Sequence, residues 1–206
     1  MGRPLLVADT SVLLNLAGPV IDREFDVPDG SDPLKNVLVR YDVHVPDTVL
    51  GELTGTTTSD DFLATSAELV LEAGDHLTRH STDENREIAG GVDPALLPGE
   101  NAGERLRTVL DSDYGLDAGE LDAIALAHAL DADLLATDEI GTDNLPTVVI
   151  LLGDDIGLAS TPQLVGLLAW VDAIEPAFAA ELLGYHRDRN GLSREYIELI
   201  RDRYLG

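Results

Sequence analysis

Residues 5–14 read Leu5-Leu6-Val7-Ala8-Asp9-Thr10-Ser11-Val12-Leu13-Leu14, and they predict a buried β-strand that passes directly into an α-helix. The apolar run stops at Asp9, and apolar residues then return at helical spacing. Two later segments have a similar order. Residues 43–45 predict a second strand, which precedes a helix that carries Glu52 near its first turn. Residues 133–137 predict another strand, and Asp138 follows it directly. Because strands that alternate with helices imply a parallel sheet, we predict an α/β fold with a central parallel sheet flanked by helices.

The rest of the chain predicts further helices and one further strand. Helices are expected over residues 59–73, 117–130, 161–172, 174–183 and 193–204, and a strand over residues 147–152. Residues 18–42 are rich in Gly, Pro and Asp and predict a long loop, while residues 83–103 hold several Gly and Pro and precede a short helix at 105–110. We expect one domain over residues 1–152, with residues 153–206 as a helical extension packed on it.

The composition is strongly acidic, with 39 acidic residues against 13 basic ones and a net charge of −26. A compact fold tolerates this self-repulsion near about 1 M salt, where the screening length is about 3 Å, so we interpret the acidity as adaptation to high salt. An acidic disordered protein is excluded, because 44% of the residues are hydrophobic and lie in periodic segments. The absence of cysteine excludes disulfides and thiolate chemistry. No apolar run has the length of a membrane span and no secretory pattern opens the sequence, so we expect a cytoplasmic protein.

Four carboxylates are placed to meet at one edge of the predicted sheet. Asp9 and Asp138 follow strands directly, and Glu52 and Glu120 lie in the first turns of helices. In a parallel α/β sheet the carboxyl ends of the strands border one crevice, where such folds bind ligands. Carboxylates that converge there repel one another unless a cation joins them or some take up protons. Oxygen ligands favour a hard divalent cation, so we expect Mg²⁺ or Mn²⁺.

Each of these acidic residues also has a purely structural interpretation. Asp9 could cap the helix that follows it, and Glu120 could complete a capping arrangement with Asp117. Glu52 could be a solvated helix residue, and Asp138 could end its strand in a turn. We favour a shared site, because one site explains all four positions together.

Four ordered segments resemble the acidic motifs of the PIN domain family. They are Ala8-Asp9-Thr10-Ser11-Val12-Leu13-Leu14, Val45-Pro46-Asp47-Thr48-Val49-Leu50-Gly51-Glu52-Leu53, Gly119-Glu120-Leu121-Asp122-Ala123-Ile124-Ala125-Leu126-Ala127 and Leu134-Leu135-Ala136-Thr137-Asp138-Glu139. The resemblance covers residues 5–152 and is greatest to relatives of the VapC-type toxins. It implies a metal-dependent ribonuclease that uses Mg²⁺ or Mn²⁺ and favours a homodimer, and it leaves open an antitoxin or another protein as partner. The extra length of this chain weakens the toxin assignment and leaves an RNA-processing enzyme as the other interpretation.

The resemblance also implies roles for individual residues. The core acidic set would be Asp9, Glu52, Glu120 and Asp138, and the further metal candidates would be Asp122 and Asp143. Glu120 ranks above Asp122, because a helix turns by about 200° over two residues and both can bind one ion only through a distorted turn or a water. The bound metal would orient and activate a water at the scissile phosphate. The hydroxyls of Thr10, Ser11 and Thr137 would orient the carboxylates or the phosphate.

An RNA ligand needs a local exception to the negative charge of the chain. The C-terminal segment concentrates five arginines, which are Arg187, Arg189, Arg194, Arg201 and Arg203. Arginine suits phosphate contacts, but neighbouring acidic residues would pair with the same side chains equally well, and both interpretations stay open.

The alternative function is a non-catalytic PIN module that scaffolds a protein or RNA partner. A phosphoacceptor receiver domain is disfavoured, because no lysine follows a late strand. A serine hydrolase is disfavoured too, because Thr10-Ser11 has no histidine at a recognisable spacing. We assign no histidine to a metal, since His44, His76, His80 and His128 fall in segments that the sequence does not relate.

Overall fold

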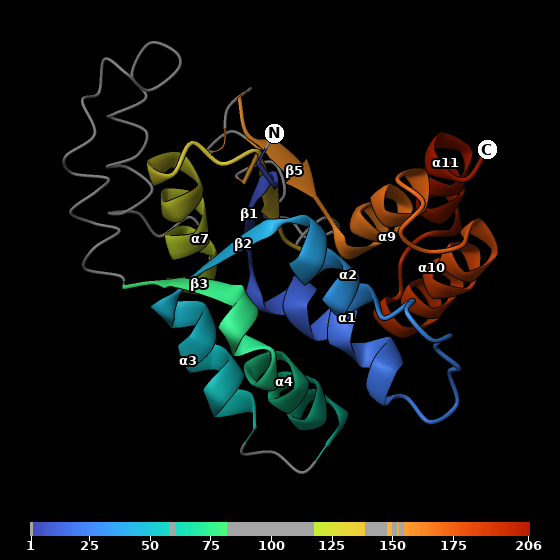
Figure 1. Cartoon of the computed structure of the whole chain (residues 1–206), viewed down its shortest axis with the longest axis horizontal. Helices are drawn as coiled ribbons and strands as arrows, with labels where there is room; N and C mark the ends of the chain where they lie inside the picture. The colour runs from blue at the N-terminus through green and yellow to red at the C-terminus, as the bar shows by residue number, and fades with distance from the viewer. Residues whose placement is uncertain (1, 58–60, 82–117, 139–147, 150–151, 153–154) are drawn as a thin grey trace.

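A five-stranded, all-parallel sheet forms the centre of the molecule (Figure 1). The computed structural model describes residues 2–57, 61–81, 118–138, 148–149, 152 and 155–206. The strand order is β3-β2-β1-β4-β5. The strands are β1 (Leu5–Ala8), β2 (Asp42–Pro46), β3 (Leu77–His80), β4 (Leu134–Ala136) and β5 (Gly157–Ala159). The predicted α/β class with a central parallel sheet flanked by helices is confirmed.

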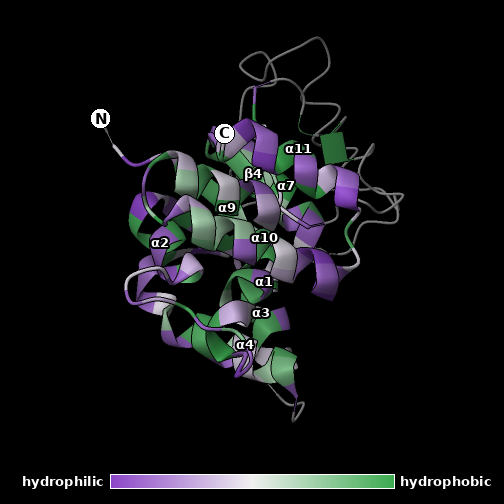
Figure 2. Cartoon of the chain, turned by 90° about the vertical axis from the view of Figure 1, so that its right-hand side faces the viewer, coloured by the Kyte–Doolittle hydropathy of each residue, from purple (hydrophilic) through white to green (hydrophobic). Residues whose placement is uncertain are grey.

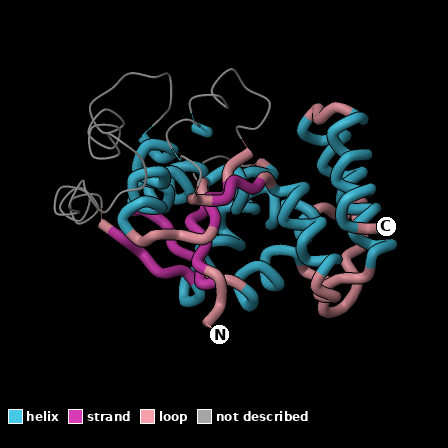
Figure 3. Tube along the Cα trace, turned by 90° about the horizontal axis from the view of Figure 1, so that it is seen from above, coloured by secondary structure: helices cyan, strands magenta, loops and turns pink. Residues whose placement is uncertain are grey.

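Helices lie on both sides of the sheet (Figure 3), and the side chains of β1 alternate between two cores on its opposite faces. Leu6 and Ala8 belong to the larger core, which is also built from helices α1 (Thr10–Ile21), α2 (Pro33–Arg40), α3 (Asp47–Thr56) and α4 (Phe62–Glu72). Val7 points the other way, into a smaller core beneath helix α7 (Ala118–Ala129). The β1 strand is therefore buried from both sides, as expected for a central parallel strand.

The prediction of a long loop over residues 18–42 is wrong. Helix α1 continues through Pro19 to Ile21, and residues 33–40 form helix α2. Asp32 caps α2 by accepting a hydrogen bond from the backbone N of Lys35 at 3.0 Å, and a proline follows at the first helical position, which favours a helix start. The many Gly, Pro and Asp residues therefore mark helix ends as well as the connection between them.

The segment after α4 contains a strand that the sequence did not suggest. A short 3₁₀ turn, η1 (Gly74–His76), leads into β3, which pairs with β2 in the register Val43 to Leu77 and Pro46 to His80. Thr78 and Arg79 are exposed. Because β3 is a short edge strand with little apolar character, it gives no strong strand pattern.

The strand predicted over residues 147–152 is also wrong where the structure describes it, since Val148, Val149 and Leu152 are helical. A short apolar run fits a strand and a buried helix equally well, so its pattern did not decide between them. The fifth strand instead comes a few residues later, at Gly157–Ala159. A side chain at Gly157 would place its Cβ 2.8 Å from Leu134 Cδ2, so glycine allows this strand to approach β4. Residues 83–103 and the short helix expected at 105–110 lie outside the described residues.

Three C-terminal helices complete the larger core. They are α9 (Thr161–Trp170), α10 (Pro176–Asn190) and α11 (Arg194–Tyr204). Gly166 of α9 lies against Tyr204 of α11, where an added Cβ would come within 2.6 Å of Tyr204 Cδ2. In Figure 2, α11 is mostly hydrophilic, and its buried residues Ile197 and Ile200 reach the shared core. These helices and the sheet therefore form a single domain. None of the helices in the described ranges has both the length and the apolar character needed to cross a lipid bilayer.

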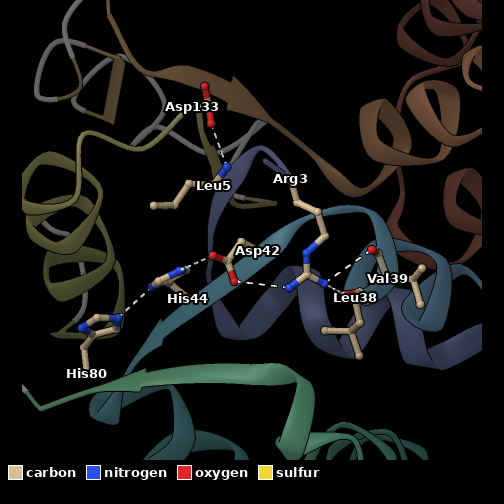
Figure 4. A network of polar contacts seen from close by, with 8 residues as sticks. All are labelled: Arg3, Leu5, Leu38, Val39, Asp42, His44, His80 and Asp133. Carbon is tan, nitrogen blue, oxygen red and sulfur yellow. Dashed lines mark hydrogen bonds and ion pairs between the residues drawn. The ribbon is translucent and has the colours of Figure 1, made fainter. Parts of the chain in front are cut away.

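Polar contacts join the start of β1 to the start of β2, and a pair of histidines joins β2 to the end of β3 (Figure 4). Arg3 donates from Nη1 to the carbonyl oxygen of Leu38 at 3.2 Å and lies 3.6 Å from Asp42. His44 and His80, on neighbouring strands, share a hydrogen bond of 2.8 Å between Nδ1 and Nε2. The sequence did not relate these two histidines, and the pairing of β2 with β3 is what brings them together.

Candidate carboxylate site at the carboxyl ends of the strands

Asp9 occupies the junction between β1 and α1, and its carboxylate is held from several sides. Oδ1 accepts a hydrogen bond from the backbone N of Thr10 at 2.7 Å, and Oδ2 accepts from the Ser11 hydroxyl at 2.8 Å and from the Thr137 hydroxyl at 3.3 Å. The side chain is only 5% exposed. Asp9 is thus the N-cap of α1, as the structural interpretation proposed, and it is also a buried, oriented carboxylate at the sheet edge.

Asp138 follows β4 and lies next to Asp9. Its backbone N donates to Ser11 Oγ at 3.2 Å, so the Ser11 hydroxyl joins the two acidic residues directly. The Asp138 carboxylate accepts hydrogen bonds from the backbone N and hydroxyl of Thr161, at 2.7 and 2.5 Å, and from Asn15 Nδ2 at 2.6 Å. Thr161 is the first residue of α9, so this carboxylate lies at a helix N-terminus, where negative charge is stabilised.

Glu52 reaches the same edge from α3. The helix begins at Asp47, so Glu52 lies in its second turn and not, as expected, near its first. The Thr10 hydroxyl donates a short hydrogen bond to Glu52 Oε2. On its other side the carboxylate lies against the backbone of Gly119, where an added Cβ would be 2.5 Å from Glu52 Oε1. Glu52 is therefore held between α1 and α7 and is not a freely solvated helix residue.

Glu120 enters from the first turn of α7 and is 8% exposed. Together with Asp9 and Thr137 it lines a cavity of about 10 Å³, which is also lined by apolar side chains of α7 and β4 and by Val148. A cavity of that volume holds about one water molecule. Two carboxylates from residues more than a hundred positions apart thus border one small buried space.

The structure brings together most of the residues that the sequence singled out. Asp9, Thr10, Ser11, Glu52, Glu120, Thr137 and Asp138 are connected through the contacts described above. Asp122, two residues after Glu120, is 5% exposed. Asp143 and Asp117 lie outside the described residues. Within the described ranges, no group of three or more acidic or histidine side chains is close enough to hold one ion. Asp138 and Glu52 instead direct their oxygens toward hydrogen-bond donors.

Four polar residues at this edge were not found from the sequence. They are Asn15, Thr161, Ser160 and Tyr196. Asn15 is one helical turn after Ser11, a spacing that places both on one face of α1. Ser160 and Gln163 form a capping box at the start of α9, a pattern visible in the sequence. Neither signal by itself indicates contact with Asp138.

Tyr196 of α11 closes the site on the side of α9. Its hydroxyl lies 2.6 Å from Ser160 Oγ. Burial raises the pKa of Tyr196; the hydrogen bond with Ser160 opposes this change, and the charge of Asp138 adds to it. The phenol therefore remains a neutral hydrogen-bonding group beside the carboxylates.

No family model matches this sequence. Comparison with curated proteins and with solved structures likewise finds no similar protein. A function can therefore be inferred only from the side chains at this edge of the sheet and from the motifs that they form.

The C-terminal arginines contact separate neighbouring groups. Arg187 pairs with Asp188 at 2.6 Å, Arg194 pairs with Glu198 at 2.7 Å, and Arg201 donates to the carbonyl oxygen of Ala180 at 2.8 Å. The Arg203 guanidinium lies 5.5 Å from the ring centroid of Tyr204. Arg189 differs from these residues, because it lines a groove beside the carboxylate site.

Proposed function

We propose that this protein is a metal-dependent endoribonuclease that hydrolyses RNA phosphodiester bonds at the carboxylate site. The observation that carries the proposal is the gathering of Asp9, Glu52, Glu120 and Asp138 at one edge of the sheet. These residues come from four separate segments; contacts with Thr10 or Ser11 position Asp9, Glu52 and Asp138, and Glu120 lines a small cavity together with Asp9. Carboxylates are the ligands that Mg²⁺ and Mn²⁺ prefer, and such ions catalyse phosphodiester hydrolysis.

The residues fit a hard cation in part. Asp9 and Glu120 border one buried space and would be its first ligands, with Asp122 as a further candidate. Two buried carboxylates so placed repel each other unless a cation or a proton compensates. When bound, the metal would activate a water and offset the negative charge that builds up on the phosphate.

The other side chains would act by positioning. Ser11 and Thr137 donate to Asp9 Oδ2 and so fix the direction of its lone pairs. Thr161 and Asn15 do the same for Asp138. Such outer partners typically change metal affinity or activity about 10- to 100-fold when replaced.

RNA as the substrate rests on the resemblance of the four acidic motifs to PIN domains. An antitoxin-like protein partner, a homodimer and a cytoplasmic location belong to the same proposal. The proposed ribonuclease could act as an RNA-processing enzyme instead of a toxin, since the chain carries helices α9, α10 and α11 in addition to the residues that form the acidic motifs.

Cleavage of a fluorescent single-stranded RNA in molar KCl, with Mg²⁺ or Mn²⁺ added, tests the proposal. We expect the Asp9→Asn variant, which keeps the shape of the N-cap, to lose activity by at least about 100-fold. Asp75→Asn removes the same charge at an exposed residue of the η1 turn, and this variant should cleave RNA like the wild type. Equal cleavage by the wild type and Asp9→Asn would reject the site.

The second candidate is a non-catalytic module that scaffolds a protein or RNA partner. One observation favours it: both oxygens of Asp138 already accept hydrogen bonds, and the space beside Asp9 holds only about one water. RNA that is bound but not cleaved at any Mn²⁺ concentration would support this candidate over the nuclease.

A further inference from the structure

A groove borders the carboxylate site on the side of α10. It lies between the middle of α1, the start of α4 and the end of α10, and its volume is about 430 Å³. The lining residues used below are Asn15, Phe62, Tyr185, Arg189 and Asn190. A volume of this order falls within the range of about 300–1,000 Å³ that is typical of small-ligand sites.

Asn15 connects this groove to the carboxylates. Its side chain lines the groove, and its Nδ2 donates to Asp138 Oδ2 at 2.6 Å. A ligand in the groove would therefore lie beside Asp138. A polymeric substrate cut at the carboxylates would extend into the groove with the unit next to the cleaved bond.

The walls of the groove combine a cation with aromatic rings. The Arg189 guanidinium lies 3.4 Å from the centroid of the Phe62 ring and 6.0 Å from that of Tyr185. Gly18 forms the floor, and an added Cβ there would be 3.3 Å from Phe62 Cζ and 3.4 Å from Tyr185 Oη. Burial raises the pKa of Tyr185 to about 12, so this ring stays uncharged. Arginine planes and aromatic faces are the surfaces on which unpaired bases stack.

Arg189 is less tightly paired with an acidic residue than Arg187 and Arg194 are. With a net charge of −26, the chain repels a polyanion everywhere except where a cation is locally accessible. The carboxylates that pair with Arg187 and Arg194 are within 2.7 Å of them, whereas Asp22 lies 3.9 Å from Arg189 Nη1. The Arg189 side chain is 38% exposed. Its N–H groups are therefore oriented by Asp22 but remain able to contact a phosphate.

We propose that this groove binds the nucleotide of a single-stranded RNA that adjoins the scissile phosphate. The phosphate contacts the N–H edge of Arg189, the base stacks on the outer face of the Arg189 guanidinium, whose inner face rests on the Phe62 ring, and the Asn190 amide faces the base edge. This proposal rests on the proposed ribonuclease function, because it takes the substrate of that site as its ligand.

The test is the affinity for a labelled single-stranded RNA oligonucleotide, measured by fluorescence anisotropy with EDTA present over a series of KCl concentrations. Arg189→Gln should weaken binding by about tenfold and reduce the slope of log affinity against log salt by about 0.7, the loss of one phosphate contact on a single strand. Phe62→Leu should weaken binding by at least about fivefold without changing that slope, because the Arg189 plane loses the ring that supports it for stacking while its charge stays. A loss of packing alone would weaken binding in both variants, but it would not reduce the salt dependence of binding in Arg189→Gln while leaving it unchanged in Phe62→Leu.

The matched control is Arg40→Gln, which removes one positive charge from an exposed residue at the end of α2, near the amino-terminal edge of the sheet. It should bind RNA with the affinity and slope of the wild type. Melting temperatures of all variants show whether each one is folded under the conditions of the assay.

The outcomes separate this proposal from the nuclease itself. If the wild type cleaves RNA while Arg189→Gln binds RNA with unchanged affinity and slope, the groove proposal is overturned and the nuclease stands. Binding that depends on Arg189 but is never followed by cleavage supports the groove and rejects the nuclease. If the wild type binds no RNA, or binds it no more tightly than polyglutamate of equal length, the groove does not recognise RNA and the proposal fails.

Discussion

His186 makes the folding stability depend on pH in a way that can be calculated. The residue lies on α10 and is fully buried, with its ring edge-on to Tyr185 at a centroid distance of 5.4 Å. Burial lowers the pKa of His186 to about 4, and the nearby Arg189 acts in the same direction. The folded protein therefore holds this imidazole neutral, while the unfolded chain protonates it near pH 6.5.

The sign and the magnitude follow from this difference. Below the unfolded pKa the unfolded chain binds one more proton than the folded chain, so stability falls as the pH falls, and the loss levels off below the folded pKa. The difference between the two pKa values corresponds to about 3 kcal/mol in total, of which about 2 kcal/mol is already lost at about pH 5.

Urea unfolding in molar KCl at about pH 8 and about pH 5 measures this contribution. The His186→Leu variant cannot take up the proton, so its unfolding free energy should fall by about 2 kcal/mol less than that of the wild type over this interval. Carboxylate titrations occur in both proteins and cancel in the comparison. His76→Gln replaces an exposed histidine and should follow the wild type. Equal losses in the wild type and His186→Leu would refute the assignment of a buried neutral imidazole.

Two further predictions concern the carboxylate site. Gly119→Ala would place a Cβ 2.5 Å from Glu52 Oε1, so we expect RNA cleavage to fall by at least about tenfold although the helix propensity of the residue rises. The control is Gly184→Ala, which has open space around the added Cβ and should keep full activity. Thr161→Val removes the hydroxyl that donates to Asp138 at almost constant volume, and it should lower the unfolding free energy by about 1–3 kcal/mol in urea titrations; a stability equal to that of the wild type would contradict this role.

The sequence predicted the central strands because burial on both faces leaves a plain apolar pattern. β1 and β4 have this pattern, and an acidic residue follows each of them, Asp9 directly after β1 and Asp138 two residues after the end of β4. The edge strands β3 and β5 lack the pattern, because they need only one neighbour and contain Thr78, Arg79 and Gly157. Their pairing depends on the rest of the sheet, which local sequence does not encode.

The site was predictable as far as it depends on position along strands and helices. Asp9 and Asp138 were placed correctly, because the carboxyl ends of neighbouring parallel strands meet. The contacts of Glu52 were not predictable, since they depend on how α7 packs against α3 and on the missing side chain of Gly119. Thr161 was missed for a similar reason, because only the folded β5 brings the start of α9 to Asp138.

The anchoring of Asp138 by α9 means that the acidic motifs depend on a part of the chain that contains none of them. A protein shortened to its first 152 residues would retain every candidate ligand, yet it would lack β5, Thr161 and Tyr196. The connection between β5 and α9 is the buried residue Ser160, so the strand and the helix are held in the core together. The smallest unit of this fold therefore extends beyond the motif-bearing residues into the C-terminal helices.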